Sequence, residues 1–523
     1  MTADQAARAG RREWTGLGVL ALACVLYSMD LTVLHLAVPE LTADLQPSSA
    51  QLLWIVDIYG FMLAGSLITM GTLGDRIGRR RLLLIGAAAF GAASLLAAFS
   101  TSAEMLIAAR ALLGVAGATL APSTLSLIRN MFQDPGQRTL AIGVWITSFS
   151  AGAVVGPPLG GVLLEFFWWG SVFLLAVPVM ALILLLAPVL VPECRDPGAG
   201  RLDLPSAALS LVAVLAVIYG LKQIAQDGLG GSPALSVAAG LALGVLFVRR
   251  QRRLADPLID LRLFRKPAFS ASLVTYLLAT FVAFGAFFFI FQYLQLVLEL
   301  PAIEAALWAM PSFAAFIVGA MLTPVVVRRL RPAFVMACGL ALAAVGYALL
   351  TQVDGGSGLA LLVTASVVFS LGEAPVFTLA TDLVVGTAPP ERAGAAAAIS
   401  ETSSELGGAL GIAILGSIGT AVYRDRMSDV PESVPPDVAE VASDTLGGAV
   451  AVADQLPAAL GADLLGSARD AFTQGLQVTM GVSSAVAAGT AVFVLVLLRH
   501  VRAGAEEAEH PDLGPAAAAP ERP

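Results

Sequence analysis

Apolar segments long enough to cross a membrane recur along almost the whole chain, and this pattern decides what the chain can fold into. A membrane-spanning helix needs roughly 20 mostly apolar residues. Stretches of about this length, separated by polar connections, predict an all-α polytopic membrane protein with fourteen spanning helices, of which the eighth is the shortest. They cover 15–37, 52–72, 82–100, 105–127, 140–163, 170–191, 204–221, 233–248, 268–292, 303–326, 333–350, 360–381, 395–420 and 474–498.

The composition excludes a water-soluble globule. Mean hydropathy is +0.83, and only 13% of the residues are charged, about half of what a soluble domain carries. So few charges cannot cover the surface of a 53.7 kDa soluble protein. The three cysteines and three histidines are too scattered for a disulfide framework or a metal site; they are Cys24, Cys194, Cys338, His35, His500 and His510.

The basic residues predict how the chain is oriented. With the N-terminus in the cytoplasm, 25 of the 30 basic residues fall in cytoplasmic connections, as the positive-inside rule requires. We therefore expect cytoplasmic tails at 1–14 and 499–523, the second of them disordered, and a long acidic extracellular loop at 421–473. The basic connection 249–267 either lies along the inner leaflet or is a plain positive-inside anchor, and the sequence favours the anchor.

Several charged residues lie inside the apolar segments. A charge at the centre of a bilayer costs about 2.5–3.5 kcal/mol or more, so such residues are rare and usually functional. Asp30 and Arg110 are two of them. Glu401 and Glu405 are four residues apart, share one helix face, and cannot both ionise cheaply, so one of them should hold a proton near neutral pH. Carboxyls hydrogen-bonded within a packed bundle are the structural alternative.

The connection "GTLGDRIGRRRL", from Gly71 to Leu82, joins the second and third segments by a short turn. Its glycines allow a tight turn and close helix approach. Asp75 is placed to cap the start of the next helix and to meet a nearby arginine. We interpret the connection as a gating latch, with a simple basic loop as the alternative.

Glycines line one face of the fifth segment. Gly152, Gly156 and Gly160 are four residues apart and form an extended GxxxG ridge for close helix packing. Pro157 and the following proline should bend or locally break the helix. A lone GxxxG would indicate packing only; the full pattern, which also includes Gly161, is more specific.

These motifs resemble the major facilitator superfamily, and within it the fourteen-helix branch of drug:proton antiporters of the QacA/LfrA type. The resemblance is carried by "MDLTVLHLAVP" (29–39), "GTLGDRIGRRR" (71–81), Arg110 with Gly114, the glycine pattern of the fifth segment, "WIVDIY" (54–59) and "SETSSELG" (400–407). It implies two six-helix bundles, at 15–191 and 268–498, with an inserted helix pair and its linkers at 192–267. A central cavity is expected between the bundles.

The resemblance implies a proton-coupled multidrug efflux transporter of the bacterial cytoplasmic membrane. Its substrates would be lipophilic cations such as quaternary ammonium compounds and cationic dyes. We expect it to need no cofactor beyond the proton gradient, to bind no nucleic acid, and to work as a monomer in the bilayer. The residues assigned to proton coupling are Asp30, Arg110, Glu401 and Glu405; to substrate binding Asp30, Asp57, Tyr59, Trp145, Glu373, Glu401 and Glu405; and to gating or structure Gly71, Gly74, Asp75, Arg76, Gly78, Arg79, Arg80, Gly152, Gly156, Pro157, Gly160 and Gly161.

Two positions depart from the family pattern or extend it. Some relatives carry a further acid in the tenth helix where this chain has Phe316, which weakens the expectation for divalent cations. Glu373 adds an acid to the twelfth segment, either facing the cavity or packed and protonated. Of the phenylalanines between Phe281 and Tyr293, we expect one or two to touch substrate.

Other functions are weighed against this one. ATP-driven export is excluded because no lysine is followed by the Ser or Thr of a P-loop. The sequence shows no set of a nucleophile and a base that would indicate an enzyme. A dedicated exporter of an endogenous metabolite or antibiotic stays open, because a fold does not determine its substrate. A proton-coupled uptake symporter is disfavoured by the glycine pattern of the fifth segment, through the resemblance alone.

Overall fold

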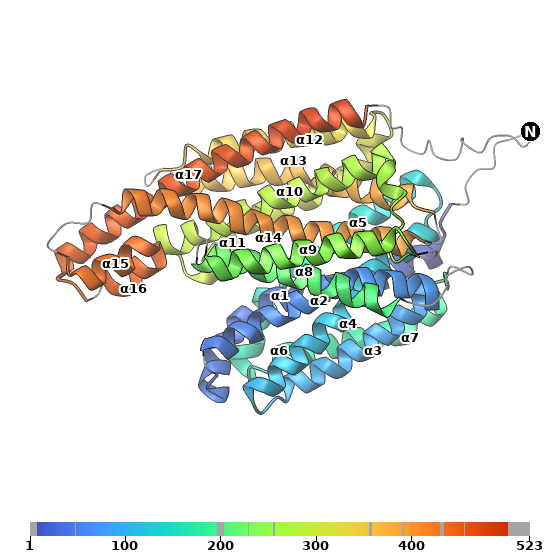
Figure 1. Ribbon diagram of the computed structural model, residues 1–523, viewed down its shortest axis with the longest axis horizontal. Coiled ribbons are helices and arrows are strands. Elements are labelled where there is room, and N and C mark those ends of the chain that lie inside the picture. The colour runs from blue at the N-terminus through green and yellow to red at the C-terminus, as the bar shows by residue number, and fades with distance from the viewer. Residues whose placement is uncertain are drawn as a thin grey trace, which may run out of the picture.

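The computed structural model describes residues 8–47, 49–195, 203–227, 230–254, 257–354, 358–389, 392–428, 434–453 and 455–499. These residues fold into long, roughly parallel helices and contain no β-strand (Figure 1). The helices of the first half are α1 (Arg11–Leu45), α2 (Ser49–Ile77), α3 (Arg79–Ala98), α4 (Ala103–Met131), α5 (Pro135–Phe166), α6 (Ser171–Leu174), α7 (Ala176–Leu190), α8 (Leu204–Asp227) and α9 (Gly231–Gln251).

The second half begins with a short 3-10 turn, η1 (Leu263–Arg265), and contains a π-helical turn, η2 (Tyr293–Val297). Its α-helices are α10 (Pro267–Gln292), α11 (Ala302–Val327), α12 (Pro332–Leu350), α13 (Gly358–Thr387), α14 (Ala393–Arg426), α15 (Pro436–Asp444), α16 (Leu446–Ala453) and α17 (Ala458–Leu497).

Eleven helical spans within the described residues are long and apolar enough to cross a membrane. They include α8 and α9. The predicted segment 233–248, the shortest of the fourteen, lies within the 21-residue helix α9. Helices α1, α2 and α5 have 35, 29 and 32 residues, but each contains side chains outside the described part. The predicted all-α membrane fold class is confirmed, while the count of fourteen spans stays a prediction.

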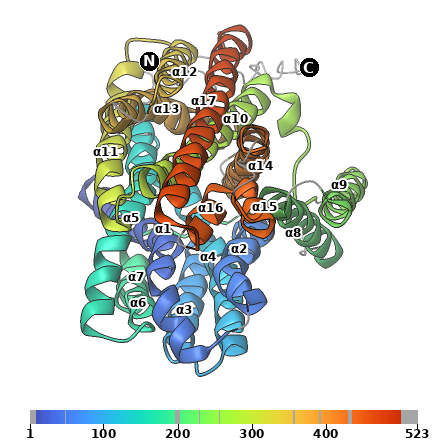
Figure 2. The ribbon, with the colours of Figure 1, turned by 90° about the vertical axis from the view of Figure 1, so that its left-hand side faces the viewer.

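The long helices pack into two groups with separate cores. In the first, α1 packs on α5 and α7, and α4 packs on α2 and α3; in the second, α10 packs on α14, and α12 on α13 and α17. The groups meet where α11 contacts α5 and where α14 contacts α2. Helices α8 and α9 pack on each other at one side of the molecule, beside α2 and α14 (Figure 2). The domain boundaries drawn from the sequence stay predictions.

Local sequence signals explain several helix ends. The Ser102 hydroxyl caps α4 by accepting a hydrogen bond from the Met105 amide at 3.2 Å. Asp134 caps α5 in the same way, accepting from the Gln137 amide at 2.8 Å, and Pro135 occupies the first helical position. These caps fix the ends of the two helices that carry the central motifs.

Three details differ from the sequence prediction. The segment 170–191 is interrupted at Leu175, which separates α6 from α7. Helix α5 runs unbroken past Pro157 and Pro158, so of the predicted bend or local break the break is wrong and the bend stays a prediction. Most of the described part of the 421–473 loop is helical: it contains the end of α14, α15, α16 and the start of α17. Helix α16 packs against α17.

The start of α1, the turn between α2 and α3, and the end of α17 lie at one end of the molecule, which we call the basic end, on the right in Figure 1. Arg11, Arg79, Arg138 and Arg331 lie there, and α15 and α16 lie at the opposite, far end.

Candidate translocation cavity and gate

A cavity of about 860 Å³ lies between the two groups of helices. Helices α1 and α5 contribute to its wall from the first group, and α10, α11, α13 and α14 from the second. This volume is typical of a pocket for a drug-sized molecule. Its lining residues are Tyr27, Ser28, Trp145, Ile146, Phe149, Ser150, Tyr276, Ala283, Phe284, Phe287, Phe288, Phe291, Gln292, Phe313, Phe316, Ser370, Glu373, Phe377, Glu401, Ser404, Glu405 and Ile412.

The charged side chains in this wall are all acidic. Glu373 comes from α13, and Glu401 and Glu405 from α14, whereas no lysine, arginine or histidine is among the lining residues. Glu401 is only 8% exposed, and its Oε1 atom has no hydrogen-bond partner within the described structure. A buried carboxylate oxygen without a partner favours a cationic or hydrogen-bond-donating ligand.

Glu373 is both a cavity residue and a packed one, whereas its protonation stays a prediction. It lines the cavity yet is only 2% exposed, and the Tyr347 hydroxyl donates a hydrogen bond to it. Tyr347 stacks on Phe369 with ring centroids 4.8 Å apart, which fixes the donor in place.

Aromatic side chains make up half of the lining residues. Four come from the phenylalanine-rich run of α10, namely Phe284, Phe287, Phe288 and Phe291. That one or two of them touch substrate stays a prediction. The rings of Phe287 and Phe313 stack in parallel planes with centroids 5.5 Å apart. Aromatic faces attract cations, each contributing about 0.5–2 kcal/mol. Phe316, at the position where some relatives carry an acid, also lines the cavity.

Asp30 and Arg110 form a buried ion pair between α1 and α4. Arg110 Nη1 lies 2.8 Å from Asp30 Oδ2, and its Nε donates to the Ile55 carbonyl at 3.1 Å. The guanidinium also lies 4.8 Å from the centroid of the Tyr59 ring. Arg110 is 1% exposed, so the pair is almost fully removed from solvent.

This pair lies apart from the large cavity. Asp30 instead borders a water-sized pocket of about 10 Å³, together with residues of α6 and α7 such as Phe173 and Ala176. Asp30 and Tyr59 were expected to contact substrate, but neither lines the large cavity, so substrate contact by them has no support from this geometry. Trp145 does line it, donating through Nε1 to Thr124 at 2.9 Å. The side chain of Asp57 lies outside the described residues.

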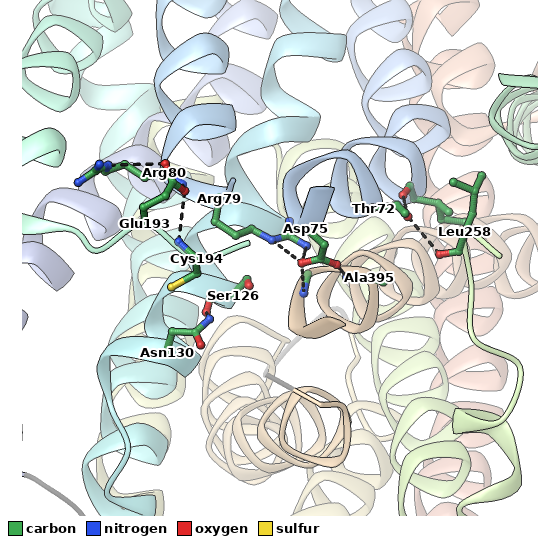
Figure 3. A network of polar contacts seen from close by, with 12 residues as sticks. Thr72, Asp75, Arg79, Arg80, Ser126, Asn130, Glu193, Cys194, Leu258 and Ala395 are labelled. Carbon is green, nitrogen blue, oxygen red and sulfur yellow. Dashed lines mark hydrogen bonds and ion pairs between the residues drawn. The ribbon is translucent and has the colours of Figure 1, made fainter. Parts of the chain in front are cut away.

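The motif between α2 and α3 joins the two groups at the basic end (Figure 3). Asp75 accepts hydrogen bonds from the backbone amides of Gly394, at 3.3 Å, and Ala395, at 3.0 Å, in the first turn of α14. It also pairs with Arg79. The sequence predicted a cap on the next helix. This is corrected by the structure: Asp75 caps α14, and Gly78 at the start of α3 provides no side-chain cap.

Glycines make this contact possible. A Cβ atom on Gly71 would lie 2.3 Å from the Ala398 Cβ atom of α14, and one on Gly74 would lie 2.6 Å from Arg79 Nη1. Gly78 has φ of +113°, a backbone conformation that favours glycine. Arg80 donates to the carbonyls of Pro188 and Val191, both at 3.1 Å, and so ties the motif to the end of α7. Arg76 lies at the end of α2, next to Asp75, and is partly buried.

The glycine ridge of α5 divides into close and open positions. A Cβ atom on Gly152 would lie 2.2 Å from the Val25 carbonyl oxygen of α1, whereas one on Gly161 would meet nothing within 4 Å. Gly156 and Gly160 are buried, and the side chain of Pro157 lies outside the described part. Gly152 therefore sets how closely α1 and α5 approach.

A second link across the basic end was missed by the sequence analysis. Asp382 of α13 pairs with Arg138 of α5 at 2.9 Å and accepts from the Thr139 hydroxyl at 2.8 Å. Arg129 of α4 donates to the Gly386 carbonyl of α13 at 3.2 Å. The available signal was an acid in "ATDLVV", just past an apolar segment and opposite arginines assigned to the same side.

Comparison with known proteins identifies relatives over most of the chain. The family model described as "Major Facilitator Superfamily" matches residues 20–412. The multidrug efflux pump LfrA of Mycolicibacterium smegmatis is 44% identical over 94% of this chain and 97% of its own length. The methyl viologen resistance protein SmvA of Salmonella typhimurium is 35% identical over 88% of this chain and 93% of its own length. The crystal structure of the human organic anion transporter MFSD10 (TETRAN) matches in fold, with a TM-score of 0.61 at 15% identity, over 92% of this chain and 99% of that one.

Proposed function

This chain belongs to the Major Facilitator Superfamily, and on that premise we propose that it exports lipophilic cations, such as quaternary ammonium compounds and cationic dyes, in exchange for protons. It is a multi-pass membrane transporter and not an enzyme, and its relatives carry names of drug efflux and resistance. The cation preference and the proton coupling are the new elements of the proposal.

The observation that carries the proposal is the wall of the large cavity. Three carboxyl groups, no basic residue and eleven aromatic rings line it. A lipophilic cation supplies the positive charge that a buried carboxylate lacks, and its apolar body is held by the aromatic faces. A neutral or anionic molecule of the same size would leave Glu401 without a charge partner. The name of one relative, the methyl viologen resistance protein SmvA, supports this, since viologens are cations.

We assign the coupling proton to the carboxyl group of Asp30, with Arg110 as its charge partner. Burial makes an isolated Asp30 carboxylate costly, and Arg110 offsets that cost while Asp30 is ionised. When Asp30 takes a proton, the charge attraction that holds α1 to α4 is lost. Tyr27 and Ser28 of α1 line the cavity only two to three residues away. Movement of α1 therefore connects the proton site with the substrate site, without requiring both ligands to share one carboxyl group.

The link between Asp75 and α14 and the link between Arg138 and Asp382 supply the gate. Both join the two groups at the basic end, and both must break before the cavity can open there. Alternating access in transporters of this kind is largely a rocking of one bundle against the other. We propose that the basic end faces the cytoplasm of a bacterium, that both termini lie there, and that the monomer is the functional unit, with no cofactor besides the proton gradient.

The test uses purified protein in liposomes with an imposed pH gradient, acid inside. Ethidium added outside should accumulate in the liposomes, and a protonophore should abolish the accumulation. The Asp30→Asn variant should fail to accumulate ethidium, whereas Arg424→Gln, which changes an exposed pair at the far end, should behave as the unmodified protein. Ethidium uptake that ignores the pH gradient would overturn proton coupling. No uptake of any cation by folded protein would overturn the cation preference and favour a dedicated metabolite exporter.

A further inference from the structure

A basic segment joins the inserted helix pair to the second group of helices. Its described parts, 252–254 and 257–266, lie between the end of α9 and the start of α10, and together we call them the basic strap. Because apolar spans end at Gln251 and begin at Pro267, the basic strap lies at the level of the lipid headgroups.

Buried polar contacts fix the strap to α8 and α9. Gln251 is 2% exposed; its Nε2 donates to Ser206 of α8 at 2.8 Å, and its Oε1 accepts from the Leu258 amide of the strap at 2.7 Å. Arg250 forms two hydrogen bonds with Asp203, at 2.8 and 2.9 Å. A bidentate pair of this kind has a defined geometry, so the strap starts from a fixed position.

The strap also contacts both partners of the gate. Thr72 of α2 lies three residues before Asp75, and its hydroxyl donates a hydrogen bond to the Leu258 carbonyl at 3.2 Å (Figure 3). Asp260 of the strap lies 3.3 Å from Arg392, which directly precedes α14. Buried strap residues, Leu258, Ile259 and Leu263, belong to one apolar cluster with Ile68 of α2 and Ile399 of α14. The strap therefore bridges the two helices that Asp75 joins.

The outer face of the strap is basic and carries an aromatic ring. Arg252, Arg253 and Arg265 are exposed, and the Arg262 side chain is 87% exposed. Phe264, in the 3-10 turn η1, is 39% exposed among them. Basic clusters next to a span attract anionic lipids, and aromatic residues at this level insert between headgroups.

From this arrangement we propose that the basic strap binds anionic phospholipid headgroups, and that bound lipid favours the closed state of the basic end. The ligand is membrane lipid and not a soluble anion, because the exposed face lies directly between two spans and presents an apolar ring beside the charges. Headgroups that hold the strap against the bilayer also hold its contacts to Thr72 and Arg392, and these contacts keep α2 beside α14.

The test compares two variants of equal charge change. The strap variant carries Arg252→Gln, Arg262→Gln and Arg265→Gln, and the control variant carries Arg328→Gln, Arg329→Gln and Arg331→Gln, at the turn between α11 and α12 of the same end. Each is purified in a zwitterionic detergent, and the midpoint of thermal unfolding is followed while phosphatidylglycerol or phosphatidylcholine is added. Neither substrate nor pH gradient is involved, so this result is independent of the proposed transport activity.

Phosphatidylglycerol should raise the midpoint of the unmodified protein and of the control variant, and the strap variant should lose most of that rise. Spin labels at Gln133 and Pro389, on the two sides of the basic end, should show a narrower distance distribution with phosphatidylglycerol, except in the strap variant. An equal response of the strap variant, or an equal loss in the control variant, would overturn the proposal. A rise produced by inorganic phosphate at the same concentration would also overturn it, in favour of a soluble anion site. Should the triple variant fail to fold, Arg262→Gln alone is expected to show a smaller loss in the same direction.

Discussion

Asp30 of α1 and Arg110 of α4 form an ion pair of 2.8 Å that is buried on the side of α1 facing α6 and α7, away from the cavity lined by Glu373, Glu401 and Glu405. This separation divides the proposed work: one site exchanges the proton and another receives the cation. A carboxyl group that served both ligands directly would be expected to line the large cavity, as Glu401 and Glu405 do.

Removing only one partner of the Asp30–Arg110 ion pair should lower the stability of the protein. Replacing Arg110 with methionine leaves Asp30 buried without a charge partner and removes the donor to the Ile55 carbonyl. Breaking a buried pair typically costs about 3–5 kcal/mol, and an exposed pair contributes about 0–1 kcal/mol. We expect Arg110→Met to lower the thermal unfolding midpoint clearly and Arg424→Gln, in the exposed pair with Asp444, to leave it nearly unchanged. Equal midpoints for the two variants would contradict the structural importance of the Asp30–Arg110 pair.

Substrate affinity should depend on the acids and rings of the cavity wall. Glu401→Gln removes a buried charge from the cavity, and we expect it to weaken ethidium binding by roughly 10-fold or more, since a buried charge interaction exceeds 1.4 kcal/mol. Phe287→Leu should weaken binding by about 2- to 30-fold, in line with one cation–aromatic contact. Phe99→Leu, outside the cavity lining and 59% exposed, is the matched control. Ethidium fluorescence measures all three, and affinities that do not differ among them would remove the cavity as the binding site.

The glycine ridge offers a matched pair on one helix. Gly152→Ala places a Cβ atom 2.2 Å from the Val25 carbonyl oxygen, a backbone atom that moves only if α1 and α5 separate. Gly161→Ala places its Cβ atom in open space. We expect the first variant to lose transport and thermal stability, and the second to keep both. If Gly161→Ala proved as harmful as Gly152→Ala, the ridge would act through some other conformation than this one.

The gate should loosen when its second link is removed. Asp382→Asn keeps the shape of the side chain but gives up the ion pair with Arg138. We expect the basic end to open more often, which faster thiol labelling of a cysteine placed at Ser126, buried near the end of α4, would report. Asp425→Asn, an acid at the far end of α14, should leave the labelling rate unchanged.

The contribution of the Arg250–Asp203 ion pair to stability should not change with pH in the physiological range. The hydrogen bonds from Arg250 hold the pKa of Asp203 at about 2, below its ordinary value of 3.8. A carboxyl group whose pKa is lowered by folding stabilises the protein above its unfolded pKa and loses that contribution as the pH falls towards the folded one. The change in unfolding midpoint caused by Asp203→Asn should therefore be the same at about pH 5.5 and pH 7.5, and shrink only below about pH 4. A change that differed between the two upper values would contradict the ion pair.

Much of this arrangement can be predicted from local sequence. The apolar segments locate the helices, and the charges inside them single out Asp30, Arg110, Glu401 and Glu405, because a charge in hydrocarbon is costly wherever it lies. Partners distant in the chain cannot be predicted in this way. The contact between Asp75 and Ala395 joins residues 320 positions apart, and nothing local to either residue indicates the other.

The cavity wall was the least predictable part. The second half of α10, from Phe281 to Phe291, is apolar on every face, so it contains no polar stripe to show which phenylalanines point inward. Glu373 was ambiguous for a related reason: its hydrogen bond comes from Tyr347, on a neighbouring helix. The helices α15 and α16 were hard to predict because they are short and follow a proline-rich stretch.

The central claim, that proton and cation occupy separate residues, is tested most directly by measuring proton release when ethidium binds to the purified protein in weakly buffered solution with a pH indicator. The unmodified protein should release protons in proportion to the ethidium bound. Asp30→Asn should bind ethidium with nearly the same affinity and release far fewer protons. Proton release that survives in Asp30→Asn, or ethidium affinity that collapses in it, would contradict the separation of the two sites.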